Sequence, residues 1–216
     1  MKFAREGWPF VLPFVFVAAV LFFLGYPGYG VAALIVALCI LLFFRDPSRA
    51  YEGEVGVVLA PADGLVTRVD VIEDPEVGPG RWHRIVTFLS VFDVHVQKTP
   101  ASGQVVVSRY AAGRKVAAFR EDAGEVNEKH LTVIRRPNGD VLGVRQIAGL
   151  LARRVVCYLK EGDQVHRAQP MGLIKFGSRV DLLVPESYRL MVKKGDRLKN
   201  GATPVAAPAE PGGGTR

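Results

Sequence analysis

Residues 130–149 read HLTVIRRPNGDVLGVRQIAG, with two β-branched, apolar runs on either side of Pro137-Asn138-Gly139-Asp140. An Asn-Gly pair between such runs favours a tight β-hairpin, because both residues tolerate the left-handed backbone angles of the turn. Shorter runs of the same kind, each bounded by turn residues, occur at 57–59, 65–69 and 85–89. The pattern predicts a mainly β domain, a β-sandwich or barrel-sandwich, over residues 45–201.

Two short patterns occur twice in this part of the chain. PADGLV at 61–66 is echoed by PASGQVV at 100–106, and KEGDQV at 160–165 is echoed by KKGDRL at 193–198. Each combines the start of a strand with a turn in which glycine supplies unusual backbone angles. The second pair resembles the strand–turn units of biotinyl- and lipoyl-type folds. The echoes are too short to establish a duplication, but they favour a compact β-sandwich or barrel.

The first 44 residues have a different character. Residues 8–24 and 31–44 are uncharged apolar runs, joined by a link of Gly, Pro and Tyr at 25–30. A spanning helix needs roughly 17–25 apolar residues, so the first run is long enough and the second only marginally so. We expect a transmembrane helical hairpin at 1–44 that anchors the chain, with a shallow re-entrant hairpin as the alternative.

The charges near the hairpin predict its orientation. Lys2 and Arg5 precede it, Arg45 and Arg49 follow it, and the link between the apolar runs has no charge. Positive charge at both ends predicts that both ends lie in the cytoplasm, so the protein is expected in the inner (cytoplasmic) membrane with its β domain facing the cytoplasm. The net charge of +7 suits a surface of anionic lipid headgroups. A nucleic-acid partner is not expected, because the sequence has no helix-turn-helix, zinc-finger or RNP-like pattern.

Residues 172–185 read GLIKFGSRVDLLVP, with Gly177-Ser178 between two apolar runs. A glycine weakens such a strand unless the backbone needs an unusual conformation there. If the turn is strained, the serine hydroxyl can attack the preceding carbonyl and form an ester. β-Elimination then breaks the chain, and the resulting dehydroalanine hydrolyses to an N-terminal pyruvoyl group with loss of ammonia. By itself, a Gly-Ser pair is more often an ordinary turn or bulge.

Other stretches stand in order around this one, over nearly the whole domain. They are FFRDP at 43–47, LAPADG at 59–64, LSVFDVHVQKTP at 89–100, Asn127-Glu128, and QIAG with ARR between 146 and 154. With Phe176-Gly177-Ser178 in IKFGSRVDLLVP, the ordered set resembles the phosphatidylserine decarboxylase family, in its short bacterial and archaeal form.

The resemblance implies self-cleavage between Gly177 and Ser178, into a β chain (1–177) and an α chain (178–216) that remain together as a heterodimer. Ser178 is expected to become the pyruvoyl cofactor, Asp63 to assist self-cleavage and His95 to handle protons during decarboxylation. The substrate is then phosphatidylserine in the membrane. It forms a Schiff base with the pyruvoyl group, loses CO2 and leaves as phosphatidylethanolamine.

One position departs from the pattern of longer relatives, which have a second histidine three residues after the first. Lys98 stands there. The base that activates the serine is therefore open between His95, Asp63 acting through water, and Lys98 with a lowered pKa. Arg179 and Arg153 are the candidates for binding the phosphodiester of the substrate.

Two other functions fit parts of the sequence. A pyruvoyl decarboxylase for a small soluble amino acid has no need of the membrane anchor. A membrane-tethered lipoyl- or biotinyl-like carrier or adaptor presents a modified lysine, but Lys175 lacks the Met-Lys-Met-like setting of a biotin acceptor. No metal site is expected, since the histidines have no metal-binding spacing. Residues 202–216 are expected to be a disordered tail. Whether the protein forms a homo-oligomer is left open.

Overall fold

The computed structural model describes residues 1–54, 56–113, 126–149, 154–175 and 178–209. The chain divides into two units, Met1–Ser48 and Arg49–Arg216.

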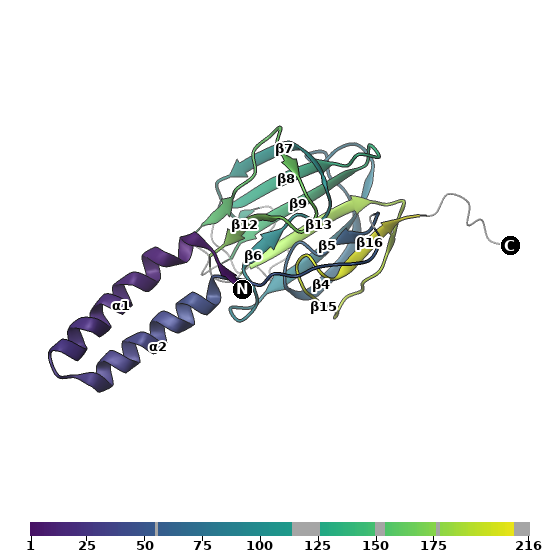
Figure 1. Cartoon of the computed structure of the whole chain (residues 1–216). Helices are drawn as coiled ribbons and strands as arrows, with labels where there is room; N and C mark the ends of the chain where they lie inside the picture. Colours follow the sequence, from purple (N-terminus) through teal and green to yellow (C-terminus); the bar gives the residue numbers. More distant parts are fainter. Residues whose placement is uncertain (55, 114–125, 150–153, 176–177, 210–216) are drawn as a thin grey trace. The chain divides into compact units, whose positions relative to one another are not determined.

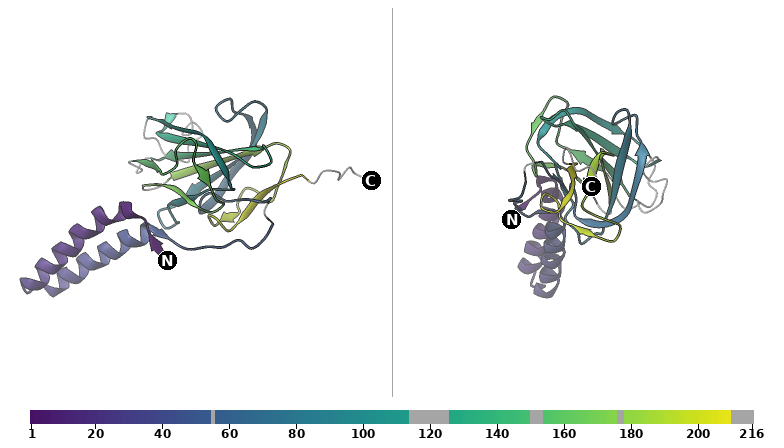
Figure 2. Two further views of the ribbon diagram at one scale, coloured as in Figure 1. Left: turned by 45° about the horizontal axis from the view of Figure 1, so that its top comes forward. Right: turned by 90° about the vertical axis from the view of Figure 1, so that its right-hand side faces the viewer.

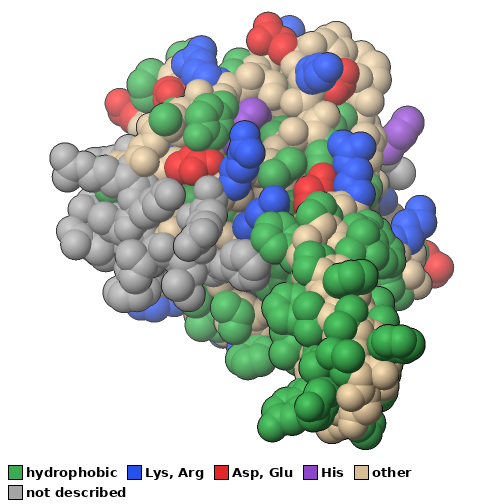
Figure 3. Space-filling model, turned by 90° about the vertical axis from the view of Figure 1, so that its left-hand side faces the viewer, with side chains coloured by type: hydrophobic (Ala, Val, Ile, Leu, Met, Phe, Trp, Pro, Cys, Tyr) green, Lys and Arg blue, Asp and Glu red, His purple; other side chains and the backbone are tan. Residues whose placement is uncertain are grey.

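The first unit contains two apolar helices, α1 (Trp8–Phe23) and α2 (Pro27–Phe43), preceded by the short helix η1 (Arg5–Gly7). The helices lie side by side (Figure 1), and hydrophobic side chains cover much of their surface (Figure 3). Among the described residues, Arg5–Phe23 is one helical stretch long and apolar enough to cross a membrane, whereas α2 is shorter. The two helices of the predicted hairpin are present, and its span of a membrane stays a prediction.

A two-stranded pairing joins the ends of this hairpin. β1 (Lys2–Phe3) pairs antiparallel with β2 (Arg45–Asp46). The first unit therefore ends at Ser48 and not at residue 44, the boundary that the apolar run predicts. Backbone pairing thus adds Arg45 and Asp46 to this unit, beyond the apolar run.

The second unit is built from strands, as predicted. They are β3 (Val58–Leu59), β4 (Gly64–Glu73), β5 (Arg81–Leu89), β6 (Val96–Lys98), β7 (Gly103–Ala111), β8 (Lys129–Arg135), β9 (Val141–Ala148), β10 (Val155–Cys157), β11 (Gln164–Val165), β12 (Pro170–Ile174), β13 (Ser178–Pro185), β14 (Tyr188–Leu190), β15 (Arg197–Leu198) and β16 (Pro204–Pro208). Within the described residues the largest sheet has eight strands, in the order β11-β7-β8-β9-β13-β5-β4-β15, and it curls as Figure 2 shows. Two three-stranded sheets have the orders β10-β12-β6 and β14-β16-β3.

The main hydrophobic core brings together aliphatic side chains of the large sheet and of the small sheets. Ile85, Val144 and Leu182 from the large sheet share one buried cluster with Met171 and Ile174 from β12. These positions alternate with residues of the opposite face, such as Leu183, which belongs to a second buried cluster. Burial of this apolar surface is the main force that holds the sheets together.

The predicted hairpin at 130–149 is confirmed. β8 pairs antiparallel with β9. In the turn between them, Gly139 has a φ of 89°, and the Arg136 N–H donates to the Asp140 carbonyl at 2.8 Å.

The echoes in the sequence correspond to a repeated structure. The strands β6–β12 form one copy, and β3–β5 together with β13–β16 form the other. The two copies occupy the two halves of the large sheet in the same order, counted inward from each end. From one end the order is β11, β7, β8, β9, and from the other it is β15, β4, β5, β13. The hydrogen bonds match as well. Val66 N–H donates to the Asp196 carbonyl at 2.9 Å, and Val105 N–H donates to the Asp163 carbonyl at 2.9 Å.

One copy is thus inserted into the other, between β5 and β13. In the inserted copy, β8 and β9 are joined by a tight turn. In the outer copy, the corresponding strands β5 and β13 pair directly, with Leu89 opposite Ser178, although the whole inserted copy separates them in sequence.

The predicted tail begins too early. Pro204–Pro208 forms β16, which pairs with β14 and β3 and buries Val205 and Ala206 completely. The composition of ATPVAAP suggested disorder, but its prolines stand at the two ends of the strand, where the missing N–H groups are tolerated. Residues 210–216 lie outside the described residues.

Candidate active site

Several strands of the large sheet begin or end side by side, and we call this row of strand ends the edge. Ser178, the first residue of β13, pairs with Leu89 at the end of β5 and with Ala148 at the end of β9. β4 lies beside β5 and begins at Gly64. The backbone of Ser178 is therefore flanked on both sides by paired strands. Gly177, the other residue of the predicted cleavage site, lies outside the described residues.

Gly64 allows β4 to begin close against β5. Its φ is 144°, and a Cβ at this position would lie 2.2 Å from the Phe88 carbonyl oxygen. A larger residue does not fit there, and L-residues rarely adopt this backbone conformation. The glycine that follows Asp63 therefore brings that carboxylate to the same edge as Ser178.

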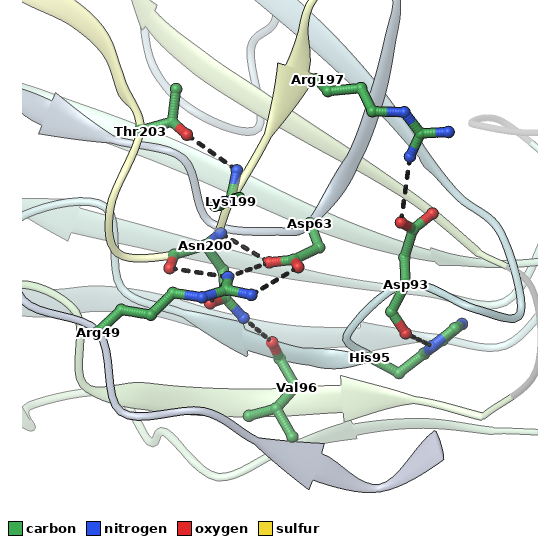
Figure 4. A network of polar contacts seen from close by, with 9 residues as sticks. All are labelled: Arg49, Asp63, Asp93, His95, Val96, Arg197, Lys199, Asn200 and Thr203. Carbon is green, nitrogen blue, oxygen red and sulfur yellow. Dashed lines mark hydrogen bonds and ion pairs between the residues drawn. The ribbon is translucent and has the colours of Figure 1, made fainter. Parts of the chain in front are cut away.

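Asp63 is the centre of a buried polar network (Figure 4). Arg49 donates from Nη1 to Oδ1 and from Nη2 to Oδ2, the second at 2.8 Å. The Asn200 N–H also donates to Oδ1, at 2.8 Å. A carboxylate oxygen accepts about two hydrogen bonds. Oδ1 is thus fully occupied, and Oδ2 has one acceptor position left among the contacts of the described residues.

Asn200 connects this carboxylate to the strand that carries the next candidate residue. Its side chain is completely buried. Its Oδ1 accepts from Arg49 Nη1 at 2.7 Å, and its Nδ2 donates to the Val96 carbonyl at 2.5 Å. Since Val96 follows His95, the network fixes Asp63 and the backbone beside His95 relative to one another.

Replacing Asn200 by alanine is expected to lower the free energy of unfolding by about 1–3 kcal/mol, because the Val96 carbonyl and an Arg49 N–H lose their buried partner. Slower self-cleavage is expected as well, since Asp63 loses part of its support. Thermal unfolding and a time course of cleavage after synthesis measure the two effects. Gln164→Ala, which removes an exposed amide side chain on β11, is the control. Wild-type values for Asn200→Ala in both measurements would contradict this role.

His95 is buried, with only 1% of its surface exposed. Its Nδ1 lies 2.9 Å from the Asp93 carbonyl oxygen. A carbonyl oxygen only accepts, so Nδ1 carries the proton of the neutral ring and Nε2 holds the lone pair. Asp93 is fixed in turn, because its Oδ2 accepts from Ser90 N–H at 2.8 Å and from the Ser90 hydroxyl at 2.7 Å. The contact at Nδ1 therefore makes Nε2 the basic nitrogen of the ring.

Two buried glutamines extend from His95 towards β13. Gln97 Nε2 donates to the carbonyl oxygen of His95. Because a carbonyl oxygen only accepts, this contact fixes the orientation of the Gln97 amide. Gln97 Oε1 then faces Gln146 and accepts a hydrogen bond from Gln146 Nε2 at 2.8 Å. This order leaves Gln146 Oε1 as a buried acceptor with no hydrogen-bond partner in the described part of the chain. Gln146 pairs with Val180, two residues along β13 from Ser178.

Lys98 is also buried at this edge. Its side chain is 4% exposed, and its N–H donates to the Pro61 carbonyl at 2.8 Å. A Cβ on Gly201 would lie 3.0 Å from Lys98 Cδ. The stem of Lys98 therefore lies beside the turn that carries Asn200. The three candidates for the base, Asp63, His95 and Lys98, are all buried on this side of the domain.

Arg179 has a different environment from the one expected of a headgroup-binding residue. It is 3% exposed, and its Nε and Nη2 donate to the two oxygens of Asp181 at 2.6 and 2.7 Å. Its predicted contact with the substrate stays a prediction, and the structure gives its guanidinium a carboxylate partner. Arg153 lies outside the described residues. Among the described residues, no group of His, Cys, Asp and Glu has the arrangement of a metal site.

Sequence reasoning missed Arg49, Asn200 and the Gln97–Gln146 pair. From its position after the apolar runs, Arg49 is predictable only as a charge that orients the membrane hairpin. The sequence offered one signal for Asn200, since it precedes a glycine just after the second KKGDRL-type echo. Gln97 and Gln146 each stand next to apolar residues of a predicted strand, and a polar residue in such a place can indicate a buried hydrogen bond.

The chain is similar to known proteins over almost its full length. The family model for phosphatidylserine decarboxylase matches residues 36–206. A phosphatidylserine decarboxylase proenzyme of Symbiobacterium thermophilum is 40% identical over 202 residues, which cover 94% of each chain. The proenzyme of Saccharopolyspora erythraea is 43% identical over 203 residues, or 93% of this chain and 86% of that protein. The proenzyme of Granulibacter bethesdensis is 42% identical over 202 residues, or 92% and 82%.

Proposed function

This chain belongs to the phosphatidylserine decarboxylase family, and on that premise we propose that it decarboxylates phosphatidylserine through a pyruvoyl group made from its own Ser178. The enzyme is a carboxy-lyase that converts phosphatidylserine to phosphatidylethanolamine and CO2. The names of the relatives describe proenzymes, which fits a chain that is activated by processing. The observation that carries the proposal is the position of Ser178, at the start of β13 and at the edge where Asp63 also lies.

The sheet explains how the enzyme survives cleavage between Gly177 and Ser178. β13 lies inside the eight-stranded sheet and pairs with β9 on one side and β5 on the other. β15 and β16, which also belong to the α chain, pair with β4 and β3 of the β chain. The contact of Asn200 with Asp63 likewise joins the two chains. The products of cleavage thus remain together as a heterodimer.

In self-cleavage, Asp63 acts through water as the acceptor for the hydroxyl proton of Ser178. Its contacts with Arg49 and Asn200 hold the carboxylate in one orientation and leave one acceptor position on Oδ2. Asp63 therefore has a position that can accept a hydrogen bond from water. His95 and Lys98 remain the alternatives for this step.

In decarboxylation, the pyruvoyl ketone supplies the electron sink that stabilises the negative charge left when CO2 departs. His95 Nε2 takes up a proton and then donates it to the carbon that has lost the carboxylate, while Nδ1 stays held by the Asp93 carbonyl. Gln146 Oε1 is a buried acceptor on the strand beside β13, opposite a residue two positions from Ser178. Leaving a buried acceptor without a hydrogen bond is costly, so this atom favours a substrate that carries an N–H group. It accepts an N–H of the serine headgroup.

The membrane hairpin keeps the enzyme where its substrate is. The fatty-acid tails of phosphatidylserine remain in the bilayer, so the active site must reach the headgroup there. The positive charges of Lys2, Arg5 and Arg45 favour a cytoplasmic location for both ends of the hairpin, at the inner membrane. The relatives favour this enzyme over a carrier with a modified Lys175, since the three quoted above are decarboxylase proenzymes.

Intact-mass measurement of the full-length protein, purified from membranes, tests the proposal. Two fragments are expected, residues 1–177 and 178–216. The second is expected to be blocked to Edman sequencing and to react with hydroxylamine as a ketone does. The same sample releases labelled CO2 from carboxyl-labelled phosphatidylserine. A single unmodified chain with full decarboxylase activity would rule out the pyruvoyl mechanism.

A further inference from the structure

The inserted copy has its own version of the active-site edge. Five residues line a cavity of about 330 Å³ there, and we call this place the second corner: Ser102, Arg136, Pro137, His166 and Arg167. The first corner is the equivalent place in the outer copy, around Asp63 and Asn200.

The two corners share their backbone geometry. In the first corner, the Asn200 N–H donates to Asp63 Oδ1 at 2.8 Å. In the second, the Arg167 N–H donates to Ser102 Oγ at 2.9 Å. The residues that follow Asn200 and Arg167, Gly201 and Ala168, have φ angles of 65° and 64°. Ser102 therefore takes the place of Asp63, and Arg167 takes the place of Asn200.

The adjacent strands confirm this correspondence. A Cβ on Gly64 would lie 2.2 Å from the Phe88 carbonyl oxygen, and a Cβ on Gly103 would lie 2.3 Å from the Arg135 carbonyl oxygen. The residue after Phe88 is apolar, but the residue after Arg135 is Arg136, which lines the cavity.

The second corner thus keeps the backbone but changes the charge. The carboxylate of the first corner is replaced by the Ser102 hydroxyl, and no acidic side chain is among the described residues that line the cavity. Arg136 is only 9% exposed. Its Nη1 donates to the Tyr188 hydroxyl at 2.7 Å and its Nη2 to the Gly56 carbonyl at 2.9 Å. Both acceptors are neutral, and the nearest carboxylate in this chain of contacts, Asp140, accepts from the Tyr188 hydroxyl.

A buried cation with neutral partners favours an anion in the adjacent cavity. Arg167 also lines the cavity, and its guanidinium packs over the ring of Tyr51 at 5.1 Å and donates from Nη1 to the Glu54 carbonyl, another neutral acceptor, at 2.7 Å. The Ser102 hydroxyl accepts the Arg167 N–H and keeps its own hydrogen to donate. Arginine and hydroxyl donors together match the oxygens of a phosphate group.

We propose that the second corner binds a phosphate group, in the place that the Asp63 carboxylate takes in the first corner. The phosphate is either a free ion or the phosphodiester of a lipid headgroup. The site is separate from Ser178 and does not depend on self-cleavage.

Thermal unfolding of the full-length protein in detergent tests the site. Sodium phosphate is titrated against sodium chloride at equal ionic strength. Binding to the folded state raises the melting temperature with phosphate concentration, so a larger rise in phosphate than in chloride is expected. Equal melting temperatures in the two salts would overturn the proposal.

Two variants of one position make the test specific. Ser102→Asp restores the carboxylate of the first corner, so we expect a higher melting temperature without phosphate and loss of the phosphate-dependent rise. Ser102→Asn introduces a side chain of the same size as aspartate but without its charge. This variant is expected to keep the phosphate-dependent rise in melting temperature. A wild-type phosphate response in Ser102→Asp would contradict binding at this corner.

A second pair of variants addresses the arginine. Arg167→Gln is expected to reduce the phosphate-dependent rise, whereas Arg189→Gln, an exposed arginine on β14, is expected to leave it unchanged. Equal responses of these two variants would also contradict the proposal. Glycerophosphoglycerol, a phosphodiester without an amine, distinguishes the sources: a stronger effect than that of phosphate indicates a lipid headgroup, and a weaker effect indicates the free ion.

Discussion

Replacing Ser178 by alanine is expected to leave the chain in one piece and to abolish release of CO2 from phosphatidylserine. Alanine has no hydroxyl to attack the preceding carbonyl, so neither the ester nor the pyruvoyl group forms. The loss of activity is expected to be complete within detection, because the variant lacks the electron sink and not merely a proton donor. Intact-mass measurement and labelled phosphatidylserine provide the two readouts.

The variant is expected to fold, since β13 is held by its backbone pairing with β5 and β9. Its melting temperature separates loss of chemistry from loss of structure. Ser187→Ala, an exposed serine of the same predicted fragment, is the control and should be cleaved normally. Cleavage of Ser178→Ala at the same bond would remove Ser178 from the mechanism.

Replacing His95 by glutamine is expected to give a cleaved but nearly inactive enzyme. Glutamine is close in size and offers hydrogen bonds, but it cannot transfer a proton as the imidazole does. General acid catalysis contributes roughly 10²–10⁴-fold to a rate, so a loss of kcat of this order is expected. Cleavage should persist, because on our proposal Asp63 and not His95 activates Ser178. The measurement is the rate of CO2 release per cleaved protein.

The outcome for His95→Gln separates three roles. An uncleaved chain would identify His95 as the base for self-cleavage and correct the role of Asp63. A cleaved chain with the wild-type rate would remove His95 from the reaction. His83→Gln is the control, a partly buried histidine on β5 towards the strand end away from Leu89.

The sequence predicted those parts of the fold that depend on local patterns. The turn at Pro137–Asp140 was predictable because its residues favour one backbone conformation regardless of their surroundings. β16 was not predictable in this way, because its short, proline-flanked sequence becomes a strand only through pairing with β3 and β14.

The duplication shows a second limit. The echoes in sequence are short because the two copies conserve hydrogen bonds and tight backbone contacts more than side chains. Asp163 and Asp196 cap equivalent turns, one in each copy. Asp163 accepts from the Lys160 N–H and Asp196 from the Lys193 N–H, both at 2.8 Å. At the corners the residues differ, with Asp63 in one copy and Ser102 in the other. A comparison of residues therefore finds the turns and misses the corners.

The candidate site was predictable only as far as the family resemblance extends. Asp63, His95 and Ser178 stand in separate motifs of that resemblance, far apart in sequence. Arg49 and Asn200 could not be connected to Asp63, because their hydrogen bonds join distant parts of the chain. Such long-range contacts follow from the strand order and not from any local pattern.

The insertion of one copy into the other also has a consequence for the order of synthesis. The ribosome completes β5 early, but the partner of Leu89 in the sheet is Ser178, which emerges only after the entire inserted copy. Domains generally begin to fold from the N-terminal side during synthesis, and distant pairings form late. The gap between β5 and β9 is therefore filled late, by the strand that starts at the proposed cleavage site. A chain that stops short of β13 lacks Ser178 altogether, so on our proposal the precursor can be cleaved only when its sheet is nearly complete.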